Sequence, residues 1–161
     1  VGLAAFAAGD AATDATVAAL RSDGTVHAWG DNTTSGLGVT GPASPFAVAV
    51  PGLQQIVRVV ASGRGFLALD AAGAVFFWGQ SSPPAGEPAT THPVTRIAGL
   101  PPIADLAGGA AAAYQPRLVD REGKVWRADG LGAEQVTDQT EASLATPSSG
   151  ITTIDEAIRV V

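Results

Sequence analysis

Few side chains in this sequence could perform acid–base or nucleophilic chemistry. The 161 residues include two histidines, His27 and His92, and no cysteine, so a thiol nucleophile, a disulfide and a thiolate metal site are excluded. The carboxylates have no spacing typical of metal ligands. They are scattered along the chain and include Asp10, Asp14, Asp129 and Asp138. We therefore predict no catalytic residue, no cofactor and no metal, and we expect a protein that is not an enzyme.

Two short motifs have a known chemistry in other contexts. Residues 36–41 match G-x-G-x-x-G, which binds dinucleotide phosphates when it lies between a strand and a helix. Pro42 follows at once and no helix is predicted after it, so we interpret the segment as a loop. Residues 32–34, Asn-Thr-Thr, have the form of an N-glycosylation site. We interpret them as ordinary loop residues.

Composition and charge limit the classes of function further. The chain is 46% apolar and 15% charged, which predicts a folded core, and its 20 glycines and 11 prolines argue against a helical bundle. Nine basic residues against 15 acidic ones give a net charge of −6, which excludes a basic nucleic-acid surface and a polybasic membrane anchor. The longest uncharged run of small residues, 107–114, is far shorter than the roughly 20 residues of a membrane span.

Three segments of the sequence repeat with a period of about 50 residues. Gly24, Gly73 and Gly123 are 49 and 50 residues apart, and a valine follows each of them two positions later. Each segment predicts two short strands joined by a turn, in which glycine takes a positive φ at little cost. The aligned segments are 20–30, 69–79 and 119–129. We expect strands over roughly 40–50% of the chain and helix under about 10%, far from the usual average.

The predicted strands are apolar on both faces. In the second copy, Val75 and Phe77 point to one face, and Phe76 and Trp78 point to the other. A strand of this kind is expected between two neighbouring sheets. We therefore interpret Trp78 as a packing residue rather than a platform for a sugar. His27 occupies the position of Phe76, so we interpret it as a packed strand residue rather than a general base.

The repeated pattern resembles a known family. It consists of an apolar strand, Ala-x-Gly, a strand that ends in Ala-Leu, a glycine turn and Val-x-x-Trp-Gly, and its best copy is residues 57–79. In this order and period it resembles the regulator of chromosome condensation (RCC1-like) repeat family, in its bacterial type. The resemblance covers roughly residues 3–130, and the third copy departs from it with Ala128 and Asp129 in place of Trp-Gly.

The resemblance implies an all-β fold, a partial β-propeller with about three RCC1-like blades of a seven-bladed ring. The chain, 1–161, would be a single repeat domain with repeats at 3–56, 57–102 and 103–157 and the start of a fourth at 158–161. Members of the family are mostly interaction platforms. The eukaryotic prototype resembles a nucleotide exchange factor for a small GTPase, and a secreted bacterial member inhibits β-lactamases. Three blades cannot close a ring, so self-association to complete one is a further expectation.

Function is expected in the loops between the first and second strands, because loops carry binding and these differ between copies. Aromatic residues and arginine dominate binding hot spots. The partner-binding candidates are Arg64, Phe66, Tyr114 and Arg117. We predict a non-enzymatic protein-binding scaffold whose partner is a protein and not a nucleic acid, in an extracellular or cell-surface location, with the cytoplasm as the alternative. The alternative function is a carbohydrate-binding or enzyme-accessory module, or a hydrolase-associated domain.

Overall fold

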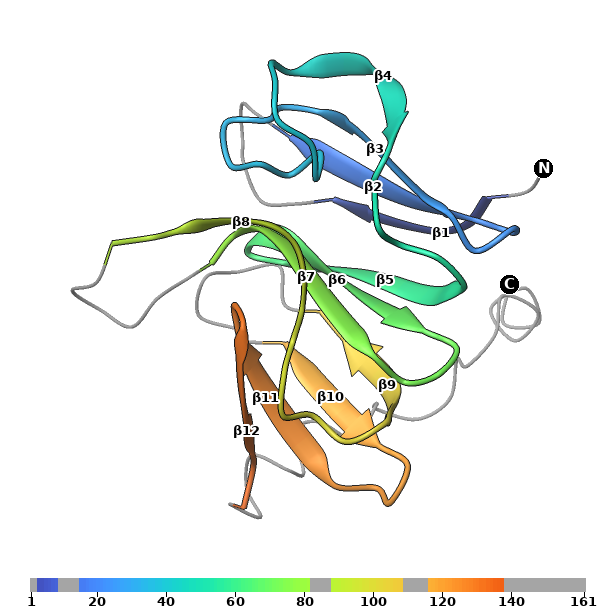
Figure 1. Cartoon of the computed structure of the whole chain (residues 1–161), viewed down its shortest axis with the longest axis vertical. Helices are drawn as coiled ribbons and strands as arrows, with labels where there is room; N and C mark the ends of the chain where they lie inside the picture. The colour runs from blue at the N-terminus through green and yellow to red at the C-terminus, as the bar shows by residue number, and fades with distance from the viewer. Residues whose placement is uncertain (1–2, 9–14, 82–87, 109–115, 138–161) are drawn as a thin grey trace, which may run out of the picture.

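The computed structural model describes residues 3–8, 15–81, 88–108 and 116–137, which form twelve β-strands and no helix (Figure 1). The strands make three antiparallel sheets of four, and strands that follow one another in sequence pair with one another. The all-β prediction is thereby confirmed. Within the described ranges, no helix is long and apolar enough to cross a membrane.

The three sheets follow one another along the chain. The first sheet contains β1 (Leu3–Ala8), β2 (Thr16–Arg21), β3 (Val26–Gly30) and β4 (Ser44–Ala49). The second sheet contains β5 (Ile56–Ser62), β6 (Arg64–Asp70), β7 (Val75–Gln80) and β8 (Thr91–Arg96). The third sheet contains β9 (Ile103–Ala107), β10 (Arg117–Asp120), β11 (Val125–Asp129) and β12 (Gly132–Gln135).

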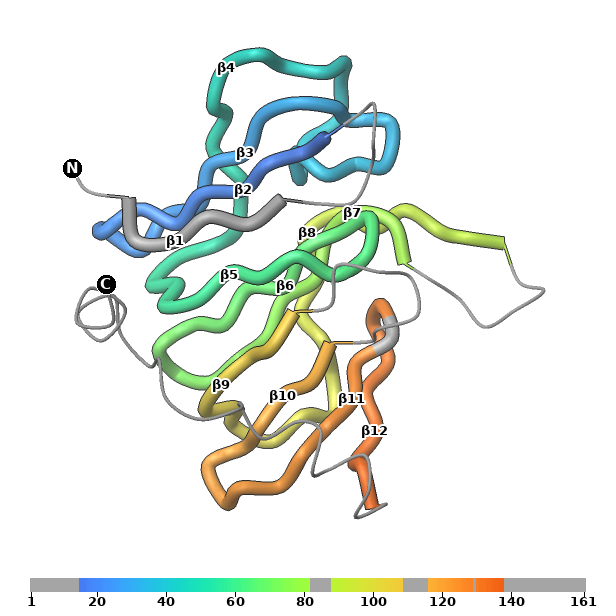
Figure 2. The backbone as a smooth tube through the Cα atoms, turned by 180° about the vertical axis from the view of Figure 1, so that it is seen from behind, coloured from blue at the N-terminus to red at the C-terminus, as the bar shows by residue number. Residues whose placement is uncertain are grey.

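The sheets stack in sequence order, with the second between the other two (Figure 1), and the view from behind shows the same order (Figure 2). The closest approaches between sheets involve their first and second strands, because β5 meets β1 and β2, and β9 meets β5 and β6. Sheets that converge at their first strands have the arrangement of propeller blades around a common axis. The prediction of a partial propeller is confirmed in this respect.

Side chains of β7 alternate between two apolar cores. Phe76 and Trp78 pack into the core that the second sheet shares with the first. Val75 and Phe77 are buried in the core that it shares with the third. Burying a side chain of this kind contributes about 1.5–3 kcal/mol. The two-faced strand predicted from the sequence is therefore confirmed, and it holds three sheets together.

The hairpin glycines serve both the turn and the contact between sheets. The φ angles of Gly24, Gly73 and Gly123 are 78°, 95° and 82°, as the repeat predicted. The Ile56 amide donates a hydrogen bond of 3.0 Å to the Gly24 carbonyl, and the Ile103 amide donates one of 2.9 Å to the Gly73 carbonyl. Each of these two turns therefore anchors the first strand of the following sheet.

Replacing Gly73 should be more costly than replacing a glycine in open space. A Cβ at Gly73 would lie 2.9 Å from the backbone nitrogen and oxygen of Ile103, whereas a Cβ at Gly52, with φ +77°, would meet nothing within 4 Å among the described residues. Gly52→Ala should cost about 1–2 kcal/mol for the positive φ alone. Gly73→Ala should cost about 1–3 kcal/mol more, because the neighbouring strand must move. Equal midpoints in urea unfolding for the two variants would contradict this account.

Trp78 joins the first sheet to the second. Its side chain is 0% exposed, and its ring stacks on that of Phe66 with 5.3 Å between the ring centroids. Its indole nitrogen Nε1 donates a hydrogen bond of 2.9 Å to the carbonyl of Gly36, in the loop between β3 and β4. The packing role predicted for Trp78 is confirmed, and the hydrogen bond adds a polar link to the loop.

Trp78→Ala should lower the free energy of unfolding by about 3–5 kcal/mol, the usual effect of truncating a large buried aromatic side chain. Trp29 occupies the same repeat position in the first sheet but is only half-buried, so Trp29→Ala is the matched control and should cost less. Denaturant unfolding of both variants tests this. A larger loss for Trp29→Ala would show that the core between the first two sheets is not the main stabilising contact.

Candidate functional site

One end of the second sheet exposes a row of polar side chains. Arg64 is exposed as the first residue of β6. Strand pairing places Arg64 opposite Gln80 on β7, and Gln80 opposite Thr91 on β8. The Arg64 guanidinium Nη1 donates a long hydrogen bond of 3.4 Å to the Gln80 Oε1. We call these three residues the Arg64 edge.

A groove adjoins Thr91, between β8 and the loop that connects β3 to β4. Its volume is about 310 Å³. Hydroxyl groups and an imidazole line it together with apolar side chains, the mixture that fixes the orientation of a bound group. The lining residues are Ser35, Gly38, Val39, Thr40, Thr91, His92 and Pro93. The groove therefore joins the first sheet to the second at the Arg64 edge.

Asn32 holds the loop that forms one wall of the groove. Its amide Nδ2 donates to the carbonyls of Val39 at 3.0 Å and Gly41 at 2.8 Å. Its Oδ1 accepts a hydrogen bond of 3.0 Å from the Leu37 amide, and Leu37 is buried in the core between the first two sheets. The side chain that could accept a glycan is thus engaged inside the protein, which supports the interpretation of residues 32–34 as loop residues.

Close packing explains the glycines of the G-x-G-x-x-G pattern. A Cβ at Gly36 would lie 2.8 Å from the Thr16 side chain, and a Cβ at Gly38 would lie 2.7 Å from the Val50 side chain. No helix follows the pattern within the described residues. The loop interpretation is confirmed, and these glycines bring the loop against β2 and Val50 instead of against a phosphate.

The Asp31 carboxylate stays charged beside this loop. Thr33 donates to its Oδ2 from both its hydroxyl and its backbone amide. The hydroxyl hydrogen bond lowers the pKa of Asp31 below its ordinary value, against the opposing effect of partial desolvation. Its role is to fix the start of the loop.

A second carboxylate with a shifted pKa is structural. Asp120 is buried, and its Oδ1 accepts hydrogen bonds from the amides of Glu122 and Lys124 in the hairpin turn. Its Oδ2 accepts one from the Trp126 indole at 3.0 Å. Burial raises the pKa of Asp120, but the hydrogen bonds from Trp126 and the turn outweigh burial and leave the pKa below its ordinary value. A carboxylate in this state closes a turn and is not a proton donor at neutral pH.

Phe66 corrects one expectation about the partner-binding candidates. It is 1% exposed and stacks on Trp78 inside the core. The turn at Gly63 is so tight that β6 already begins at Arg64. Phe66 is therefore a strand residue that points inward, and it is not available to a partner.

Arg117 and Tyr114 are placed differently from Arg64. Arg117 begins β10 and lies opposite Arg127 on β11, so it is a half-buried sheet residue. The expectation that Arg117 belongs to a loop is therefore wrong. In the repeat it takes the position of Leu67, which is buried. Tyr114 occupies the repeat position of Arg64 and lies outside the described residues, as do the loop residues 10–14. Among the candidates whose position the structure describes, Arg64 is the exposed one, and it lies where the loop meets β6.

The two histidines lie in different surroundings. His27 is half-buried on β3, as predicted, and its Nδ1 is buried without a hydrogen-bond partner. His92 lines the groove, and its ring meets that of Phe77 edge-on at 5.8 Å between centroids. Among the residues with a described position, no group of three or more histidines and carboxylates could hold a metal ion.

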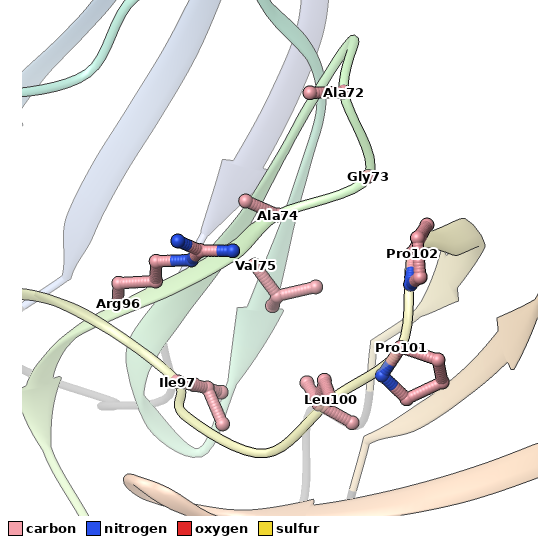
Figure 3. A pocket seen from close by; sticks show the side chains of 9 residues that line it. All are labelled: Ala72, Gly73, Ala74, Val75, Arg96, Ile97, Leu100, Pro101 and Pro102. Carbon is pink, nitrogen blue, oxygen red and sulfur yellow. The ribbon is translucent and has the colours of Figure 1, made fainter.

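The opposite end of the second sheet has a smaller hollow, of about 100 Å³ (Figure 3). Val75, Ile97 and Leu100 give it apolar walls, and Arg96 supplies its single charged side chain. It lies where the hairpin of the second sheet meets the chain that leads into the third. The hollow is a gap in the packing between sheets and is smaller than the groove.

The stacked four-stranded sheets define a segment of a β-propeller, and solved structures with an RCC1-like fold resemble it. Human WBSCR16 matches with a TM-score of 0.59 and 15% identity, over 76% of this chain and 37% of that chain. Prp20p from Saccharomyces cerevisiae matches with a TM-score of 0.58 and 19% identity, over 78% of this chain and 30% of that chain. Yeast RCC1 (Prp20), in a structure with Kap60, matches with a TM-score of 0.54 and 19% identity, over 69% of this chain and 27% of that chain.

The fold is therefore that of part of an RCC1-like β-propeller. The chain spans about a third of the length of each of these structures. The sequence matches no protein-family model and no curated protein sequence. The groove itself was not predicted, because its walls come from residues more than 50 positions apart, such as Ser35 and His92. The glycine-rich loop gave a partial signal that a close approach occurs there.

Asn32→Ala should destabilise the protein by about 1–3 kcal/mol, because the Leu37 amide and two carbonyls lose their partner in a partly buried loop. Thr40→Ala, an exposed position in the same loop, is the control and should change the free energy of unfolding by less than about 0.5 kcal/mol. Urea unfolding measures both. Equal stability of the two variants would show that the loop keeps its shape without the Asn32 amide.

Proposed function

We propose that this chain is a non-enzymatic protein-binding scaffold and that its partner binds the Arg64 edge and the adjoining groove. The observation that carries the proposal is an exposed arginine in line with Gln80 and Thr91, next to a groove built by two sheets. Arg64 stands on a rigid strand, since residues 65–69 of β6 are buried. The backbone at this position therefore needs no ordering by the partner, which reduces the entropic cost of binding.

The structural neighbours support a protein partner. Yeast Prp20p is described by its binding to Gsp1p and histones, and in a second structure the same protein, RCC1 (Prp20), is bound to Kap60. Because the present chain covers about a third of those proteins, we transfer the kind of partner and not its identity.

The chemistry of the edge indicates what the partner should offer. A guanidinium binds carboxylates in a planar two-point geometry, and Gln80 beside it can accept or donate a hydrogen bond. Thr91 and His92 extend the polar row into the groove. We therefore expect a partner segment with a carboxylate for Arg64 and a small side chain for the groove.

Binding without catalysis is part of the proposal. The carboxylates Asp31 and Asp120 are held ionised by hydrogen bonds that build a loop and a turn. A sugar-binding function would be favoured by a row of exposed aromatic rings. Trp78 is buried, and the large exposed aromatic of the described residues is Phe46 on β4, 78% exposed, so no row supports that alternative. The bacterial origin and the extracellular location stay predictions.

Arg64→Ala should weaken partner binding by about 1–2 kcal/mol, roughly 5- to 30-fold in Kd, while the free energy of unfolding changes by less than about 0.5 kcal/mol. Arg96→Ala is the matched control, because Arg96 is also exposed on the second sheet but lies at its opposite end, by the hollow of Figure 3. Titration of a partner obtained from the native source, by calorimetry with each purified variant, measures the two affinities.

Two outcomes would contradict the proposal. If Arg96→Ala weakens binding and Arg64→Ala does not, the partner binds the hairpin end of the sheets. If neither change affects the affinity, the Arg64 edge is a solvated surface. A loss of folding in Arg64→Ala would show that the guanidinium has a structural role that its exposure does not indicate.

A further inference from the structure

A pocket opens where the segment that leads into β9 meets the hairpin between β10 and β11. Its volume is about 640 Å³, about twice that of the groove between the first two sheets and within the range of ligand sites in proteins. Leu100, Pro101 and Trp126 give it apolar walls, and the exposed Arg121 and Lys124 also line it. We call this site the Trp126 pocket.

The ring of Trp126 is held in one orientation. Its indole nitrogen Nε1 donates a hydrogen bond of 3.0 Å to Asp120 Oδ2. Asp120 is itself fixed, because it is 4% exposed and accepts hydrogen bonds from two amides of the hairpin turn. Trp126 is half-buried and packs against the core between the second and third sheets, so part of its surface is left to line the pocket. A ring that is ordered in advance binds at a lower entropic cost.

The third repeat departs from the second at residues that line this pocket. Residues 70–76 read Asp-Ala-Ala-Gly-Ala-Val-Phe, and residues 120–126 read Asp-Arg-Glu-Gly-Lys-Val-Trp. The aspartate, glycine and valine of the turn and the core are retained. Three alanines are replaced by Arg121, Glu122 and Lys124, which all line the pocket. Copies that agree in packing and differ at an exposed turn have the pattern expected of a binding site.

The segment that leads into β9 also differs from its counterpart. Residues 52–55, before β5, read Gly-Leu-Gln-Gln, and residues 99–102 read Gly-Leu-Pro-Pro. The leucine of the first segment is buried, but Leu100 is half-buried. Figure 3 shows Leu100, Pro101 and Pro102 at the hollow, and the same three residues line the Trp126 pocket. An apolar surface is therefore left open here that the first two sheets close.

The backbone around the pocket has few hydrogen-bond donors to offer. Pro101 and Pro102 have no N–H group. The amide of Arg121 donates to the Pro102 carbonyl at 3.2 Å, and the amide of Gly123 donates to the Asp120 carbonyl at 3.0 Å. The other two amides of the turn donate to the Asp120 carboxylate. A ligand therefore meets no free amide on the turn of this hairpin.

The donors that remain are two charged side chains. Lys124 Nζ uses one of its three hydrogens on Glu122 Oε2 at 2.6 Å. The Arg121 guanidinium donates to the Ala72 carbonyl at 3.1 Å, and no carboxylate of the described residues forms an ion pair with it. A ligand that suits this pocket brings apolar groups for Trp126, oxygen acceptors for the two cations and few N–H groups of its own.

We propose that the Trp126 pocket binds a proline-rich segment of a partner protein in the polyproline II conformation, with an acidic side chain beside the prolines. Each proline supplies an apolar ring and a carbonyl oxygen and has no N–H to satisfy. The rings pack against Trp126 and Leu100, as in other aromatic-lined grooves that hold such segments. The acidic side chain pairs with Arg121. The pocket lies at the hairpin end of the sheets, away from the Arg64 edge, so the two sites are tested independently.

One competing arrangement uses the same cations. An acidic segment without proline would also pair with Arg121 and Lys124, and the apolar walls would then serve only the packing of the sheets. Binding of that kind depends on charge alone and is screened by salt. Replacing the prolines of such a ligand would not change its affinity.

NMR of the full 161-residue chain with ¹⁵N-labelled tryptophan gives one indole signal for each of Trp29, Trp78 and Trp126. The probe is a synthetic peptide of about ten residues, rich in proline and with one glutamate, which spans roughly 30 Å as polyproline II. It should shift the Trp126 signal in a saturable way and leave that of Trp78, which is 0% exposed, unchanged. A peptide with alanine in place of proline should bind at least about fivefold more weakly, because it is not pre-ordered.

Two outcomes of the titration would overturn the proposal. One is a Trp126 signal that does not shift at millimolar peptide. The other is equal affinity for the proline and alanine peptides, which would show that the pocket recognises charge alone.

Arg121→Gln tests the charged part of the pocket on an exposed side chain. It should weaken binding of the proline peptide about fivefold or more, the effect expected of a hot-spot contact. Arg21→Gln is the matched control, because Arg21 lies at the hairpin of the first sheet and pairs with Asp23 there. Fluorescence anisotropy of the labelled peptide measures both affinities. Equal affinities of the two variants would contradict the proposal.

Trp126→Phe tests the ring without removing the packing, since Phe76 takes the same position in the second sheet. The variant should fold, which its thermal midpoint checks, and it should bind the proline peptide at least about threefold more weakly, because its ring lacks the hydrogen bond to Asp120 that orients the indole. Wild-type affinity in this variant would show that the oriented indole is not part of the site, and the proposal would fail.

Discussion

The second sheet of this protein depends on being covered from both sides. A strand such as β7 sends Phe76 and Trp78 into one core and Val75 and Phe77 into the other. Removing either neighbouring sheet would expose large apolar side chains to water, at a cost that the backbone hydrogen bonds of one sheet cannot offset. Stability therefore belongs to the stack, and the hairpin glycines that join consecutive sheets are part of the same requirement.

This requirement separates the positions that can vary from those that cannot. Residues on the two faces of the second sheet must remain apolar and of fitting size, as the buried Leu67 and Phe77 show. The ends of the strands have no such limit, and there the repeat changes from Arg64 to Tyr114 at one equivalent position. A partner site on a protein of this kind is accordingly sought at the strand ends and in the loops that extend from them.

The sequence predicted the repeat, the glycine turns and the burial of Trp78, because each follows from a spacing that recurs in the chain. It failed at Phe66, because one residue decides whether a side chain belongs to a loop or to a strand. With the turn at Gly63, β6 begins at Arg64 and Phe66 points into the core. Arg117 was misplaced for the same reason. The groove depends on contacts between distant residues, which no local pattern contains.

The groove is also tied to the stacking of the sheets. One wall is the loop between β3 and β4, and the other is β8 of the next sheet. Asn32 holds the loop in shape through hydrogen bonds within it, and the hydrogen bond from Trp78 to Gly36 holds the loop to the second sheet. The same indole that closes the core thus positions the wall of the groove. A change that loosens the first two sheets must alter the groove as well, so binding there and the stability of the stack are linked properties of one contact.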